Sequence, residues 1–204
     1  MVESIYFKIF YIIASYLLGS VVFGYIIAMI LKKEGFGIVD RPGTAGAARQ
    51  YGLKAAIPTF LLDCAKGASV PLIGKYIGLD MITIVIASLA VLIGHNWPVF
   101  FKFKGGGGLA SSIGIGTSLI PVPFLITFGV TIIAGFIYKY TLGKKSKINS
   151  IIAGSILGIL LLPVLVYFFT KSLILVAFAI GMFIIIASKG LLLYFLQKNN
   201  TSNN

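Results

Sequence analysis

The sequence predicts an all-α protein that crosses a membrane about seven times. Hydrophobic residues make up 58% of its 204 residues, the mean hydropathy is +1.03, and only five side chains are acidic. This composition is typical of a polytopic membrane protein and leaves no room for a separate soluble domain. We therefore expect a single integral membrane domain over residues 1–198, followed by a disordered polar tail at 199–204.

Seven apolar segments follow one another along the chain, at approximately 5–31, 53–74, 81–101, 109–119, 121–138, 151–169 and 172–196. Six of them reach the roughly 17 to 25 residues that a membrane-spanning helix needs. The fourth is shorter, and we expect it to be a tilted or partial span between a glycine-rich loop and Pro121. Six or seven spans are therefore predicted.

The distribution of basic residues predicts the orientation of these spans, because short cytoplasmic loops collect Lys and Arg. In the seven-span arrangement, thirteen basic residues fall on one side, three (Lys8, Lys75 and Lys171) fall on the other, and Lys66 lies inside a span. This count places the amino terminus outside and the carboxyl terminus in the cytoplasm of a bacterial inner or plasma membrane. The net charge of +12 then reflects topology and attraction to anionic lipid, and no nucleic-acid motif accompanies it.

The loop between the third and fourth segments combines glycines with lysines. Gly105, Gly106, Gly107 and Gly108 lack a Cβ, so their N–H groups can converge on a ligand, and Lys102 and Lys104 add positive charge. Phosphate is the ligand that this combination favours. A glycine run between membrane helices can also be a simple turn or a close helix crossing.

In the longest polar stretch, residues 32–52, Gly35, Gly37, Gly43 and Gly46 should interrupt a helix, and we expect a structured cytoplasmic loop there. Arg41 precedes Pro42, which favours an extended backbone and a projecting guanidinium group. Arg41 and Arg49 could each bind phosphate oxygens with two hydrogen bonds, or could simply follow the positive-inside bias.

Two charged residues interrupt the second apolar segment, and a single histidine ends the third. Asp63 and Lys66 lie three positions apart, where an unpaired charge costs about 2.5 to 3.5 kcal/mol, so they either neutralise each other or take part in function. His95 could act as a general base or could pack structurally at the membrane edge. With one histidine and one cysteine, Cys64, no Cys/His metal site is expected, and no cofactor is predicted.

Several motifs together resemble the bacterial acyl-phosphate-dependent glycerol-3-phosphate acyltransferases over nearly the full length. They are the YLLGS sequence at 16–20 with Phe23 and Gly24, the loop ending in Arg49 and Gly52, the DCAKG sequence at 63–67, and GHNWPVFFKFKGGGG at 94–108. The family motif has a lysine where this chain has Gly107. It also has asparagines in the first loop, and a histidine, an asparagine and a glutamate near Ser188 to Leu191, none of which this chain keeps.

The resemblance implies a membrane enzyme of phospholipid synthesis that transfers an acyl group from acyl phosphate to the 1-hydroxyl of glycerol 3-phosphate, giving lysophosphatidate. The substrates and membrane lipid are its implied partners, together with an enzyme that supplies acyl phosphate. His95 and Asp63 are the implied catalytic residues. The implied substrate-binding residues are Ser20, Arg41, Thr44, Arg49, Lys66, Lys104 and Gly105 to Gly108.

Two other functions remain open at the level of sequence. A catalytically silent relative could bind lipid phosphate or a partner enzyme, and the glycine at position 107 favours this interpretation. An anion transporter would also use glycine-broken helices and charges within the membrane, although transporters often show internal repeats that this sequence lacks. A groove for the acyl chain is expected beside the small residues Ala110, Ser111 and Gly114.

Overall fold

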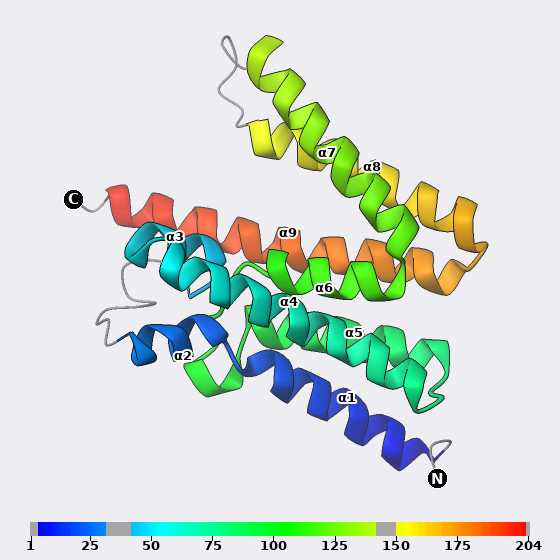
Figure 1. Cartoon of the computed structure of the whole chain (residues 1–204). Helices are drawn as coiled ribbons and strands as arrows, with labels where there is room; N and C mark the ends of the chain where they lie inside the picture. Colours follow the sequence, from blue (N-terminus) through cyan, green and yellow to red (C-terminus); the bar gives the residue numbers. More distant parts are fainter. Residues whose placement is uncertain (1–3, 32–41, 142–149, 203–204) are drawn as a thin grey trace.

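The computed structural model describes residues 4–31, 42–141 and 150–202, and within these ranges it consists of nine α-helices and one 3-10 turn. Every one of the seven apolar segments forms helix (Figure 1). The first is divided into α1 (Ile5–Ser20) and α2 (Phe23–Ile30) by two extended residues, and the others are α4 (Leu53–Tyr76), α5 (Met81–Asn96), α6 (Leu109–Leu119), α7 (Pro121–Thr141), α8 (Ser150–Thr170) and α9 (Leu173–Ser202).

Five of the described segments are long and apolar enough to cross a membrane, namely Ile5–Ile30, Leu53–Tyr76, Met81–Phe101, Pro121–Thr141 and Leu173–Leu192. Two more apolar stretches, Leu109–Leu119 and Leu157–Thr170, are shorter. The fourth predicted segment is thus a short helix, as expected. The start of α1 and the end of α9 lie at opposite ends of the bundle (Figure 1). Because α9 continues through Ser202, it includes residues 199–202 of the predicted tail.

The bundle is centred on α5, which packs against α1, α4 and α9, while α6 lies along α4. Its core contains the fully buried side chains of Val91 and Leu92 from α5, Ile115 from α6 and Phe178 from α9. The hairpin of α7 and α8 packs against the rest of the bundle mainly through α9 and projects away from α4 and α5 (Figure 1). This arrangement leaves α7 largely exposed, as expected for a helix that faces lipid.

Glycine pairs set the closest helix contacts. A Cβ on Gly67 of α4 would overlap the Ser111 carbonyl of α6, and one on Gly114 of α6 would overlap the Cys64 carbonyl of α4. Gly19 and Gly94 form the same reciprocal contact between α1 and α5. Backbone therefore touches backbone at both crossings. The acyl groove was expected beside Ala110, Ser111 and Gly114. At Ser111 and Gly114 it is not present, because α4 fills that space, whereas Ala110 borders the pocket described below.

We expected the glycines of residues 32–52 to prevent helix formation, and this was wrong for the second half of that segment. Residues Thr44–Tyr51 form α3, between Gly43 and the left-handed Gly52. Gly46 costs this helix about 1 kcal/mol relative to alanine. Burial outweighs that cost, since Gly46 and Ala47 are buried where α3 packs on α4. The helix then ends at Gly52, whose φ of 74° favours glycine.

Candidate functional site

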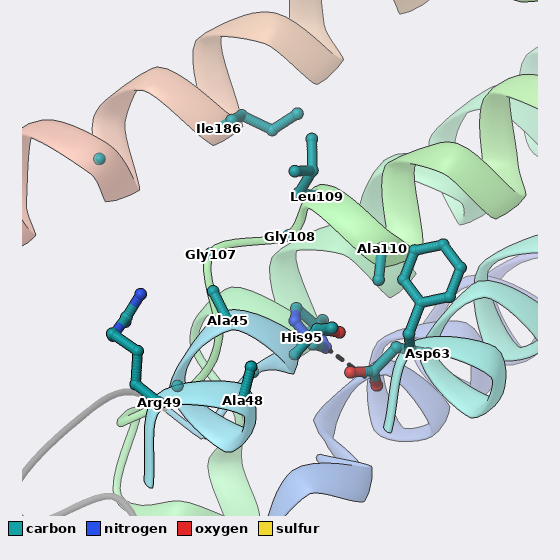
Figure 2. Close-up of a pocket in the computed structure, with 15 residues that line it drawn as sticks. Ala45, Ala48, Arg49, Asp63, His95, Gly107, Gly108, Leu109, Ala110 and Ile186 are labelled. Carbon is teal, nitrogen blue, oxygen red and sulfur yellow. Dashed lines mark ion pairs between the residues drawn. The ribbon is translucent and has the colours of Figure 1, made fainter. Parts of the chain in front are cut away.

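A pocket of about 520 Å³ lies at the end of the bundle that carries α3, which is a size typical of small-molecule sites (Figure 2). It is bounded by α3, the first half of α4, the end of α5, the glycine loop, the start of α6 and one turn of α9. Its lining residues are Gly43, Thr44, Ala45, Gly46, Ala48, Arg49, Phe60, Asp63, His95, Gly107, Gly108, Leu109, Ala110, Ile186 and Gly190.

The amino-terminal ends of two helices border this pocket. The first residues of α3 and of α6 both belong to its lining, and neither helix has a side-chain cap. The first N–H groups of a helix have no partner within the helix and carry the positive end of its dipole. A Cβ built on Gly43 would lie 3.5 Å from the Gly106 Cα, so the two ends are close together. They form a binding surface suited to an anion.

Two side chains of α3 add to this surface. Thr44 lines the pocket, and its Oγ1 is buried without a hydrogen-bond partner among the described residues. Arg49, one turn further along, extends from α3 toward α9 at the edge of the pocket (Figure 2). A guanidinium group can donate two parallel hydrogen bonds to a phosphate. The pocket therefore offers main-chain, hydroxyl and guanidinium donors to one anionic group.

A buried polar cluster forms the floor of the pocket. Asp63 Oδ1 lies 3.1 Å from Lys66 Nζ and 3.4 Å from His95 Nδ1, and all three side chains are almost fully buried. Figure 2 shows His95 directed toward Asp63. Lys66 Nζ also donates to the carbonyl oxygens of Gly19 at 3.1 Å and Val21 at 2.7 Å. Those carbonyls lie where α1 gives way to α2, so the Lys66 ammonium stabilises the break in the first segment.

The four glycines of the loop have different surroundings. Gly105 and Gly106 lie behind the pocket against α5, and the Gly106 N–H donates to the His95 carbonyl at 3.1 Å. Gly107 faces open space, with nothing within 4 Å of a Cβ built on it. Gly108 has a φ of 84° and packs against the buried Asn96 side chain, where any Cβ would clash. The run is thus a shaped turn in which only Gly107 has room for a side chain.

A short turn, η1 (Val99–Phe101), holds the loop in place. The Tyr25 ring of α2 stacks on Phe101 with ring centres 4.3 Å apart, and its hydroxyl donates to the Lys104 carbonyl at 3.2 Å. The Lys104 side chain is exposed and does not line the pocket. Ser20 is fully buried; its hydroxyl donates to the Tyr16 carbonyl at 3.0 Å and accepts from the Val99 N–H at 3.4 Å.

The structure brings together about half of the sequence-predicted site residues. The pocket lining contains Thr44, Arg49, Asp63, His95, Gly107 and Gly108. It does not contain Ser20, Lys66, Lys104, Gly105 or Gly106, which lie behind it or beside it. Arg41 lies outside the described residues.

Sequence reasoning missed the apolar part of the lining. Phe60 of α4, Leu109 of α6 and Ile186 of α9 all contribute to it, and Ile186 extends toward Leu109 (Figure 2). The available signal was the spacing of Ile186 and Gly190, which lie four positions apart on one face of α9. Nothing in their chemistry distinguishes them from other apolar residues of that helix.

The chain is similar in sequence to one family of known proteins. The sequence profile of the glycerol-3-phosphate acyltransferase family matches residues 9–197. A glycerol-3-phosphate acyltransferase of Thermoanaerobacter pseudethanolicus is 37% identical over 178 residues, which cover 82% of this chain and 84% of that protein. Glycerol-3-phosphate acyltransferase 1 of Bacillus cereus is 38% identical over 149 residues, covering 71% of this chain and 75% of that protein.

A solved structure supports the same relationship. The glycerol 3-phosphate form of PlsY, an integral membrane glycerol 3-phosphate acyltransferase, superposes with a TM-score of 0.74 at 25% identity, covering 96% of this chain and 92% of that one. The chain therefore belongs to the glycerol-3-phosphate acyltransferase family, the multi-pass membrane enzymes that acylate glycerol 3-phosphate in phospholipid synthesis.

Proposed function

We propose that the pocket holds the phosphate of glycerol 3-phosphate between the amino-terminal ends of α3 and α6, with Arg49 and Thr44 as side-chain donors. The observation that carries this assignment is the meeting of two uncapped helix ends in one pocket. Within the lining, Arg49 is the one permanently charged cation among the described residues. The phosphate thus has a single fixed cation and several main-chain N–H groups to bind.

The acyl donor in this proposal is an acyl phosphate. The 1-hydroxyl oxygen of glycerol 3-phosphate bonds to the acyl carbon, the bond from that carbon to the phosphate oxygen breaks, and the released phosphate carries away the hydroxyl proton. An acyl phosphate is already activated, so the protein contributes mainly by positioning two anionic substrates and by offsetting their repulsion. We assign Asp63 and His95, which line the pocket, to the reaction centre.

The acyl chain would leave the pocket on its apolar side. Phe60, Leu109 and Ile186 provide a lining that is apolar and partly exposed, opposite the donors of α3. A chain placed there would pass between α4 and α9 into the lipid. Of the residues expected beside the acyl groove, this path keeps Ala110 and excludes Ser111 and Gly114.

Donor choice is testable with purified full-length protein in lipid nanodiscs. Labelled glycerol 3-phosphate is supplied with palmitoyl phosphate in one reaction and with palmitoyl-coenzyme A in another, and labelled lysophosphatidate is measured. We expect product with the acyl phosphate and little with the thioester. Product from the thioester alone would contradict the donor assignment, and no product from either, across chain lengths and salt concentrations, would contradict turnover by this chain.

We also propose seven spans, with the amino terminus outside and the pocket facing the cytoplasm. The support is the basic-residue count and the position of α3 at the end of the bundle opposite the start of α1 (Figure 1). A single-cysteine test suits this chain, because Cys64 is its one cysteine. In a Cys64→Ser background, a membrane-impermeant maleimide on intact cells should label Tyr76→Cys and spare Lys54→Cys; the reverse pattern would invert the proposed topology.

A further inference from the structure

The Lys66 ammonium group is enclosed by four acceptor atoms. They are the carbonyl oxygens of Gly19 and Val21, Asp63 Oδ1 at 3.1 Å, and His95 Nδ1 at 3.2 Å. The Lys66 side chain is 1% exposed and does not line the pocket, so it does not reach a ligand there. Its contacts are instead with the residues that form the pocket floor.

The hydrogen-bonding capacity of an ammonium group restricts what can face it. Lysine has donors and no acceptor. Nδ1 of His95 lies 3.2 Å from Lys66 Nζ and can bond to it only through its lone pair, because an N–H there would point at the hydrogens of a cation. Asp63 Oδ1 is 3.4 Å from the same nitrogen but accepts no hydrogen bond with acceptable geometry among the described residues, so it does not hold a proton on Nδ1. A neutral imidazole with a lone pair on Nδ1 carries its proton on Nε2. We infer that Lys66 is a positioning residue that holds His95 as the neutral, Nε2-protonated tautomer.

The charge balance of the cluster has the same consequence. Asp63 and Lys66 neutralise each other in a buried site, and protonating His95 would add an uncompensated charge beside the ammonium group. The one cation of the pocket lining, Arg49 on α3, also faces this space, and no acid other than Asp63 lines it among the described residues. A neutral imidazole keeps the net charge of this buried cluster at zero.

The opposite side of the ring faces the loop. A Cβ on Gly106 would overlap His95 Nε2, and Nε2 has no hydrogen-bond partner among the described residues. His95 lines the pocket, and in this tautomer Nε2–H is the one ring donor that it can offer to a ligand there. This assignment rests on the proposed function: it makes His95 a hydrogen-bond donor to a substrate oxygen, either the acyl carbonyl or a phosphate oxygen.

The chain offers a direct measurement, because His95 is its single histidine. Protein labelled with ¹⁵N-histidine and purified through a histidine-free tag gives ring signals from this residue alone. We expect nanodisc samples at neutral pH to show a protonated Nε2 and an unprotonated Nδ1. A protonated Nδ1 or an imidazolium would overturn the inference.

A variant removes the cause of the tautomer. Lys66→Met alone would leave Asp63 buried and unpaired, so the double variant Asp63→Asn/Lys66→Met, which removes both charges, is the better test. In either variant that gives a monodisperse protein with wild-type helix content, the His95 signals at neutral pH should show protonation of Nδ1 as well as of Nε2, as expected for a mixture of tautomers. If they remain those of the wild type, Lys66 does not set the tautomer. This result is independent of turnover, so it does not depend on the acyltransferase assay.

Activity measurements on two variants test whether His95 acts as a hydrogen-bond donor. His95→Gln keeps an N–H donor near the position of Nε2, whereas His95→Leu has none. Loss of a well-placed donor costs about 10²- to 10³-fold in kcat, so His95→Leu should fall by that factor while His95→Gln retains clearly more. Equal losses in both variants would contradict a donor role. If the loss lies in the KM for glycerol 3-phosphate, the acceptor is its phosphate, and if it lies in kcat, the acceptor is the acyl carbonyl.

Discussion

Gly106 lies directly against the imidazole of His95: its N–H donates to the His95 carbonyl at 3.1 Å, and a methyl group on its Cα would overlap Nε2. The next residue, Gly107, has nothing within 4 Å of such a methyl group. The two neighbouring glycines therefore have different surroundings. Gly106 has no room for a side chain because it contacts His95 on the floor of the pocket, whereas Gly107 borders the empty space of the pocket.

This contrast gives a matched pair of substitutions. Gly106→Ala should lower stability by about 1 to 3 kcal/mol, the usual cost of overpacking, or displace His95 and reduce turnover. Gly107→Ala should fold with wild-type stability. Thermal unfolding in detergent and turnover in nanodiscs measure the two effects. Equal tolerance at both positions would show that the loop does not rest on His95.

Arg49 is the cation that we place on the phosphate. Arg49→Ala should raise the KM for glycerol 3-phosphate by about 10- to 100-fold, since a hydrogen bond to a charged group contributes about 1.5 to 3 kcal/mol. Lys54→Ala is the control, because Lys54 is an exposed cation at the same end of the bundle that does not line the pocket. If both variants change the KM equally, the assignment to Arg49 is wrong and general positive charge is responsible.

Gly107→Lys adds a cation to the open side of the pocket. The built Cβ has free space, so the variant should fold normally. We expect the KM for glycerol 3-phosphate to fall by about tenfold at low salt, corresponding to a charged hydrogen bond of about 1.5 kcal/mol, and the gain to shrink as salt rises. A well-folded variant with unchanged or poorer kinetics would mean that the anion does not bind next to Gly107.

Asp80 provides a pH-dependent prediction away from the pocket. Its carboxylate accepts from Lys8 Nζ at 2.7 Å and from the Thr83 N–H at 3.0 Å as the cap of α5. The hydrogen bond from Lys8, followed by those from Thr83, lowers the pKa of Asp80 well below its usual range. A lowered pKa contributes stability that is present above the unfolded value of about 3.9 and is lost as the pH falls below it.

The matched variant is Asp80→Asn, which keeps a capping oxygen and removes the charge. It should be less stable than the wild type by up to about 1 kcal/mol at pH 7, because the ion pair is partly exposed. The difference in melting temperature should shrink as the pH falls below about 4. A gap that is constant down to pH 3 would mean that the ion pair contributes nothing.

Most of the fold was predictable from the sequence, because lipid imposes long apolar segments that composition reveals. The prediction of a non-helical loop failed at Thr44 to Tyr51, since glycine propensity is a local quantity and the packing of Gly46 and Ala47 on α4 is not. The break between α1 and α2 was equally hidden. It depends on the Lys66 ammonium group, which lies more than forty residues further along the chain.

The chemistry of the pocket was predictable residue by residue, but its geometry was not. Charged and glycine residues stand out in an apolar sequence, which is why Arg49, Asp63, His95 and Gly107 were identified. Which of them face a common space depends on helix crossings with no sequence signal of their own. Lys66 and Lys104 show the limit: both are lysines in recognisable motifs, and one is buried behind the pocket while the other is exposed beside it.

The reciprocal glycine contacts of α1 with α5 and of α4 with α6 affect how this protein can change over evolutionary time. In these contacts the main chain of one helix packs on the main chain of the other. The distance between the paired helices therefore depends on glycine at four positions. Substitutions of lipid-facing residues can then accumulate without displacing the helices that form the pocket. A single methyl group gained at Gly19, Gly67, Gly94 or Gly114 would wedge the helices apart, so we expect a saturation library selected for growth to retain glycine at these positions while accepting many residues on α7.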